Sequence, residues 1–158
     1  CKELAVPQCE LLLDLEGILI PSWGDWLCPP GAAERVRAIF DTYQPDSVKI
    51  FSYAIAAQDD ALTLKAELPY LCEASGLPIS DIWLLDDVRR RLARHAQIHV
   101  ASNEDLVCYY TKESVLFSLS QSGDLAPRTI LVDDNVREQH WSLASPEQNV
   151  HIIRLPAC

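Results

Sequence analysis

Apolar residues along this chain follow two different periods. Several short runs are apolar almost throughout or at alternate positions, which is typical of β-strands buried in a sheet. The first run contains three consecutive leucines, which favours a strand that is covered on both faces. We therefore predict strands over residues 11–15, 48–52, 98–101, 129–133 and 149–155.

Between these runs, apolar residues return at every third or fourth position, the period of an amphipathic helix. This pattern predicts helices over residues 31–43, 56–75, 82–95 and 111–120. Pro69 is expected to kink or divide the second helix, and Ser80 with Asp81 to cap the third. Residues 18–20 and 25–27 flank a turn-rich segment and are predicted to pair as a small hairpin.

The order of these elements predicts the fold class. Strands that alternate with helices form a parallel sheet with helices on both faces. A chain of 158 residues suits one domain and can bury a core without disulfide bonds or structural metals. We therefore expect an α/β three-layer sandwich with a central, mainly parallel sheet, forming a single domain over residues 1–158.

Polar side chains follow the predicted strands at the point where each strand ends. Asp14 and Glu16 come after the first strand, Ser52 ends the second, and Asp133-Asp134 end a later one. Lys112 opens a late helix, the end where the helix dipole disfavours a cation. Because ligands bind at the carboxyl ends of strands in open α/β sheets, these residues are candidates for a functional site.

The residue types alone also allow purely structural roles. Ser52 can simply end a strand, Lys112 can be a solvated surface charge, and Asp133-Asp134 can cap a helix. A second acidic pair, Asp86-Asp87, precedes arginines at helical spacing, so we interpret it as part of a surface helix.

Composition narrows the range of partners. The net charge of −10 argues against nucleic-acid binding through a basic patch and suits a protein that recruits a divalent cation. No apolar segment is long enough to span a membrane and no signal-peptide pattern is present, so we expect a cytoplasmic protein without a membrane partner. The four histidines show no metal-binding spacing.

The cysteines indicate neither a disulfide framework nor a zinc site, because they form no CxxC pair and lack histidines at ligand spacing. The chain contains no methionine, and cysteines can occupy positions that are methionine in a parent sequence, so they support no conclusion about redox environment. They are scattered along the chain: Cys1, Cys9, Cys28, Cys72, Cys108 and Cys158.

Taken in chain order, the polar residues resemble the signature of the haloacid dehalogenase (HAD) superfamily, in its capless, phosphatase-like form. The resemblance implies a Mg²⁺-dependent phosphomonoester hydrolase that forms an aspartyl-phosphate on Asp14. It implies that Glu16 is the acid/base, that Ser52 and Lys112 bind phosphate, and that Lys112 is also part of the catalytic set. The implied Mg²⁺ ligands are Asp14, the backbone carbonyl of Glu16, and Asp133 or Asp134.

Glu16 departs from this signature, which usually has aspartate at that position. The extra methylene can displace the carboxyl group by more than about 1 Å, a displacement that can cost about 100-fold in rate. The alternative is therefore a HAD-like binding or scaffold domain with little or no turnover. Only a hairpin-sized flap is expected after the first strand, without a large cap, so the site suits a small or macromolecular phosphorylated substrate or a protein partner that completes it. Trp23 and Trp26 could stack on such a ligand or anchor the flap.

Overall fold

Six strands form one mixed, mostly parallel sheet in the computed structural model, which describes residues 7–54, 58–144 and 147–158. The sheet order is β3-β2-β1-β4-β6-β5, and only β5 runs antiparallel to its neighbour. The strands are β1 (Cys9–Leu13), β2 (Ser47–Phe51), β3 (Ile79–Trp83), β4 (Arg128–Asp133), β5 (Gln139–Ala144) and β6 (Glu147–Arg154). The helices are α1 (Pro30–Tyr43), α2 (Gln58–Ser75), α3 (Leu85–Ala96), α4 (Asn103–Tyr109) and α5 (Lys112–Gln121).

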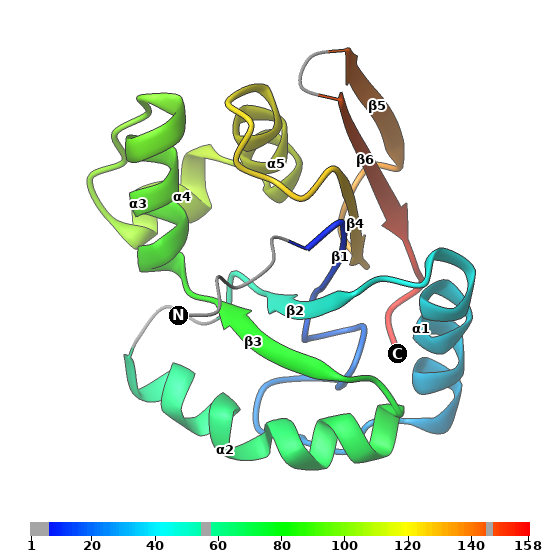
Figure 1. Ribbon diagram of the computed structural model, residues 1–158. Coiled ribbons are helices and arrows are strands. Elements are labelled where there is room, and N and C mark those ends of the chain that lie inside the picture. Colours follow the sequence, from blue (N-terminus) through cyan, green and yellow to red (C-terminus); the bar gives the residue numbers. More distant parts are fainter. Residues whose placement is uncertain (1–6, 55–57, 145–146) are drawn as a thin grey trace, which may run out of the picture.

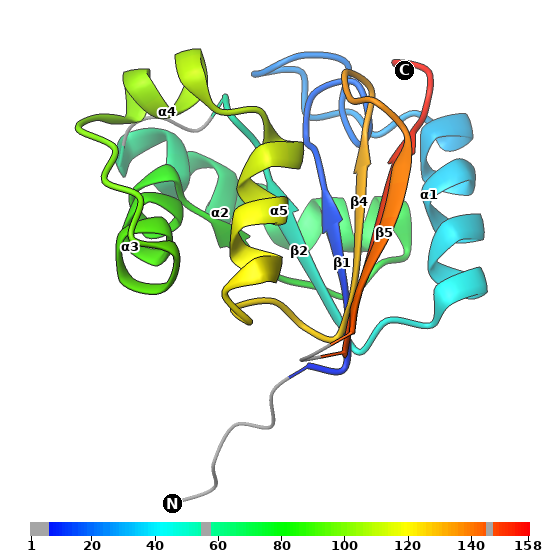
Figure 2. The same cartoon turned by 90° about the horizontal axis from the view of Figure 1, so that it is seen from above.

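The helices lie on both faces of the sheet, so the predicted α/β class is confirmed. Figures 1 and 2 show α1 on one side of the strands and α3, α4 and α5 on the other. Leu11 and Leu13 pack in the core beneath α1 and α2, whereas Leu12 packs in the core beneath α3, α4 and α5. The alternation follows from the strand period of two, and it explains why three consecutive leucines are all fully buried.

Two predictions between residues 79 and 101 are wrong, namely the start of the helix over 82–95 and the strand over 98–101. Ile82 and Trp83 belong to β3, which pairs with β2, and the predicted helix begins only at Leu85. Pairing with β2 and burial of both side chains outweigh the helical period of the sequence at these two positions. The predicted strand over 98–101 has no regular structure, and Arg89 donates hydrogen bonds to the carbonyl oxygens of Val100 and Ala101 in this segment.

Besides β3, the sequence pattern missed α4 and β5. Helix α4 is short, and β5 is an edge strand in a polar stretch that pairs only with β6. In contrast, α2 is one continuous helix that includes Pro69, within its described range. None of the helices in the described ranges combines the length and the apolar character that crossing a membrane requires.

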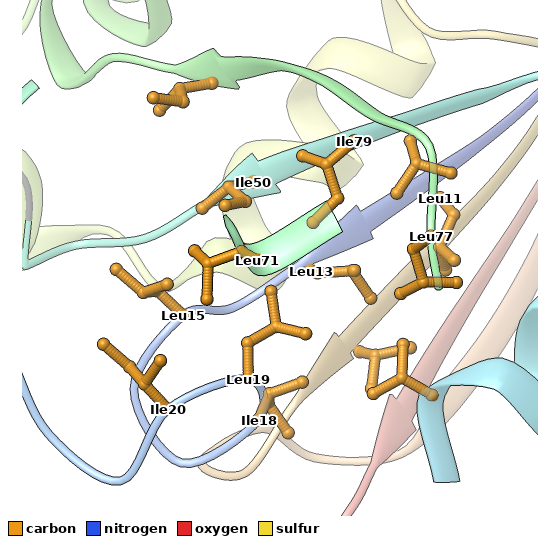
Figure 3. Packing of buried hydrophobic residues seen from close by; sticks show 14 of the residues in the cluster. Leu11, Leu13, Leu15, Ile18, Leu19, Ile20, Ile50, Leu71, Leu77 and Ile79 are labelled. Atoms are coloured by element: carbon orange, nitrogen blue, oxygen red, sulfur yellow. The ribbon is translucent and has the colours of Figure 1, made fainter. Parts of the chain in front are cut away.

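The segment after β1 is a pair of tight turns rather than the predicted hairpin of residues 18–20 with 25–27. The backbone N–H groups of Leu19 and Ile20 both donate to Leu15 O, which folds these apolar residues into the core. Figure 3 shows Ile18, Leu19 and Ile20 in the same hydrophobic cluster as Leu13 and Leu15. A single antiparallel bridge between Ser22 and Asp25 closes the second turn.

The two flap tryptophans anchor the second turn to the protein. Their rings meet edge to face with centroids 5.0 Å apart, and both pack against the core beneath α1 and α2. Trp23 and Trp26 are therefore half-buried structural residues in this conformation, as the second of the two sequence-based interpretations expects.

Candidate active site

Asp14, Ser52 and Asp133 lie at one edge of the sheet because β1, β2 and β4 are parallel. Leu13 pairs with Ile50 of β2 on one side and with Val132 of β4 on the other, so the strands end in register. The Asp14 N–H donates to Val132 O at 2.9 Å and fixes the backbone of Asp14 at the end of the ladder. Strand β2 lies on one side of β1 and strand β4 lies on the other, so the order of the strands reverses at β1. The crevice at such a switch point is where open α/β sheets bind ligands.

Lys112 reaches this edge from the first turn of α5. Thr111 caps that helix by accepting from the N–H of Ser114. The Lys112 Nζ donates to Asp14 Oδ1 at 3.0 Å and to Asp133 Oδ2 at 2.6 Å, and the side chain is almost fully buried. The helix cap and the two carboxylates together explain why a lysine stands at the unfavourable end of the α5 dipole.

Three carboxylates converge on one point beside Lys112. Asp14, Asp133 and Asp134 each offer an oxygen within 4.8 Å of the others. The N–H of Asn135 donates to Asp133 Oδ1 and orients that carboxylate. Gly17 has a φ of +82°, and a Cβ atom there would clash with the Asp134 carboxylate in its present position, so glycine leaves room for that side chain to lie where it does.

Of the lysines that the structure describes, only Lys112 lies beside the three carboxylates of the site to balance their negative charge. Burial raises the pKa of Asp14 to about 7, against the opposing effect of Lys112 and with a further contribution from the Asp133 charge. Burial also raises the pKa of Asp134, which shares a hydrogen bond with Asp133. Burial disfavours the Asp133 charge as well, but Lys112 and the Asn135 N–H outweigh it and lower the pKa of Asp133. The site therefore has a surplus of negative charge that a cation would neutralise.

A pocket of about 650 Å³ opens over these residues, and Ser52 and Glu16 line it too. Ser52 is buried, and its hydroxyl oxygen accepts from the N–H of Ala54, which orients it at the end of β2. Glu16 is half-buried, and its carboxylate is not part of the three-acid group. The structure thus brings all six predicted site residues to one pocket, but the Glu16 carboxylate lies outside the three-acid group.

The sequence did not single out the aromatic residues around the lysine. The Lys112 Nζ lies 5.4 Å from the centre of the Phe51 ring and 5.6 Å from that of Tyr53, distances at which the ring faces attract a cation. Burial, then the charges of Glu113 and Asp133, raise the pKa of the Tyr53 hydroxyl, so that group stays protonated. The only sequence signal was their position on either side of Ser52.

The competing acidic pair is structural, as predicted. Asp86 and Asp87 lie in the first turn of α3 and form ion pairs with Arg89 and Arg90 at a spacing of three residues. Those arginines lower the pKa of Asp86, mainly through the hydrogen bond from Arg89.

No protein-family model, curated protein or solved structure significantly matches this chain. The residues that the fold brings to the pocket are therefore the basis for assigning a function.

Proposed function

We propose that this protein is a Mg²⁺-dependent phosphomonoester hydrolase of the HAD type that acts through an aspartyl-phosphate on Asp14. The observation that carries the proposal is the position of Lys112 Nζ between Asp14 and Asp133, at the carboxyl ends of the parallel strands β1 and β4. A nucleophilic carboxylate, a buried cation and further oxygen ligands in one pocket are the groups that phosphoryl transfer requires.

The donor set fits magnesium. The three carboxylates supply hard oxygen ligands, and Lys112 balances only part of their charge. Asp14, Asp133 and Asp134 would hold the ion, together with the backbone carbonyl of Glu16. When bound, Mg²⁺ would neutralise charge on the carboxylates and on the phosphoryl oxygens.

The chain's own residues supply the remaining chemistry. A carboxylate oxygen of Asp14 forms a bond to phosphorus while the bond to the leaving-group oxygen breaks, and Glu16 donates a proton to that oxygen. Lys112 and the Ser52 hydroxyl stabilise the phosphoryl oxygens. Glu16 then takes a proton from water, which attacks phosphorus, releases phosphate and restores the Asp14 carboxylate.

The alternative, a HAD-like binding domain with little turnover, is favoured by one observation. In the described part of the chain, no side chain forms a hydrogen bond or ion pair with Glu16, so nothing fixes its carboxyl group over the pocket. A loosely held acid/base gives slow proton transfer, and a binding domain needs none.

Phosphate release from 4-nitrophenyl phosphate, measured with and without Mg²⁺, tests the proposal. We expect Mg²⁺-dependent release that Asp14→Asn lowers by at least about 1000-fold, because this change removes the nucleophile. Asp86→Asn, which removes an exposed acid of α3, is the matched control and should retain full activity. Absence of release from a broad panel of phosphomonoesters, with a folded protein that still binds Mg²⁺, would favour the binding domain instead.

A further inference from the structure

One wall of the pocket is apolar and aromatic, in contrast to the charged side that Asp14, Lys112 and Asp133 form. The end of α4 and the residues after it contribute Val107, Cys108, Tyr109 and Tyr110 to the pocket lining. Tyr109 is 78% exposed and Val107 is 43% exposed, so large apolar surface faces solvent at the rim. Exposed apolar surface beside a polar site is typical of a surface that a ligand covers.

Several interactions fix this wall in place. The Tyr53 hydroxyl, at the end of β2, donates to the carbonyl oxygen of Tyr110 at 2.8 Å. Ser102 caps α4 by accepting from the Asp105 N–H, and Leu106 is fully buried beneath the helix. Arg89 of α3 donates to Asn103 Oδ1 at 2.7 Å. The wall is therefore anchored both to the catalytic edge of the sheet and to the neighbouring helix.

The charge of the pocket lining disfavours a substrate that has a second anionic group besides its phosphate. Among the described residues that line the pocket, Lys112 is the single lysine or arginine, and it is already bonded to Asp14 and Asp133. Two further acidic residues, Glu16 and Glu113, line the same pocket outside the three-acid group. A second anionic group on the substrate would meet these carboxylates without a cation to pair with.

We infer that the pocket selects a phosphomonoester whose leaving group is a flat, uncharged aromatic ring, with Tyr109 of α4 as the residue that stacks on it. The inference rests on the proposed function and adds its substrate class. The phosphate lies over Asp14 and Lys112, and the ring lies against the α4 wall. A volume of about 650 Å³ accommodates a phosphate and a ring together.

Three esters with alkyl leaving oxygens test this substrate class: benzyl phosphate, propyl phosphate and 4-carboxybenzyl phosphate. We expect kcat/KM for benzyl phosphate to exceed that for each of the others by about 5- to 10-fold, since an aromatic pair contributes up to about 1.5 kcal/mol beyond area burial. Tyr109→Ala should lower kcat/KM for benzyl phosphate about 3- to 10-fold and leave propyl phosphate within about 2-fold. Glu113→Gln should raise kcat/KM for 4-carboxybenzyl phosphate selectively.

Tyr70→Ala is the matched control, because Tyr70 is an exposed tyrosine on α2 outside the pocket lining. Phenyl phosphate and a phosphotyrosine peptide without other charged side chains both have an aromatic ring on the leaving oxygen. The ratio of their kcat/KM values distinguishes a small molecule from a protein side chain as the source of the ring. Equal kcat/KM for benzyl and propyl phosphate, or a Tyr109→Ala variant that lowers both equally, would overturn the substrate class and leave the proposed function standing. Absence of hydrolysis of every ester would overturn both.

Discussion

Lys112 and Asp14 lie 98 residues apart in the chain, yet Lys112 Nζ contacts Asp14 Oδ1 at 3.0 Å in the interior of the protein. The same Nζ contacts Asp133, which ends the neighbouring strand β4. A buried lysine is costly unless paired, and here its two partners are also buried and charged. The arrangement therefore concentrates one cation and a surplus of carboxylates at the place where the fold presents its strand ends.

Removing the cation should destabilise the protein in a pH-dependent way. Lys112→Ala leaves Asp14 and Asp133 buried without their partner, and we expect a loss of about 3–5 kcal/mol in the free energy of unfolding at pH 8. At pH 5 the loss should be smaller, because a carboxylate can then hold a proton. Denaturant titration measures both values, and Lys65→Ala, an exposed lysine on α2, should change stability by less than about 0.5 kcal/mol. An equal loss at both pH values would contradict this explanation.

Asp14→Asn should stabilise the metal-free protein at alkaline pH. The pKa of Asp14 is raised from 3.8 to about 7 in the folded state, so the folded protein prefers the protonated form. Stability from this preference is complete below about pH 4 and is lost as pH rises through 7. The variant lacks this loss, so its free energy of unfolding should exceed that of the wild type by up to about 4 kcal/mol at pH 8, with the advantage shrinking toward pH 4. Thermal unfolding in chelator across this range is the measurement, and a pH-independent difference would contradict the sign.

Two glycines with positive φ offer a matched pair for testing the close approach of Asp134. Gly17→Ala and Gly24→Ala both impose a strained backbone, costing about 1 kcal/mol each. Only at position 17 would the new Cβ meet an obstacle, the Asp134 carboxylate, whereas the space at Gly24 is open. We expect Gly17→Ala to weaken Mg²⁺ binding at least about 10-fold by calorimetric titration, with Gly24→Ala unchanged. Equal Mg²⁺ affinity in the two variants would show that Asp134 need not lie there.

Glu16→Asp tests whether the acid/base is misplaced. If the longer side chain only displaces the carboxyl group, the aspartate should raise kcat for phosphomonoesters, by about 10- to 100-fold if full alignment is restored. The difference in reference pKa between the two residues, about 0.4, is worth only about half a kcal/mol and cannot give such a gain. Unchanged or lower kcat would show instead that the turns after β1 already place the longer glutamate side chain correctly.

The convergence of the candidate site residues was predictable because strand ends in a parallel sheet meet at one edge, so placing Asp14, Ser52 and Asp133 together required only the correct strands and their direction. Lys112 needed the family resemblance as well, since a lysine at a helix start is usually a surface residue. The α4 wall could not be predicted, because a helix of seven residues has too few turns for its apolar residues to show a helical period. The segment at 18–20 shows the same limit, since a short apolar run fits a strand and a buried turn equally well.

The most direct test of the central claim is chemical trapping of a phosphoryl group on Asp14. The protein is mixed with 4-nitrophenyl phosphate and Mg²⁺, quenched in acid during turnover and reduced with borohydride, which converts an aspartyl-phosphate to homoserine. Peptide mass spectrometry should find homoserine at position 14, in an amount that falls when Mg²⁺ is chelated. Sustained phosphate release with residue 14 always recovered as aspartate would contradict the account.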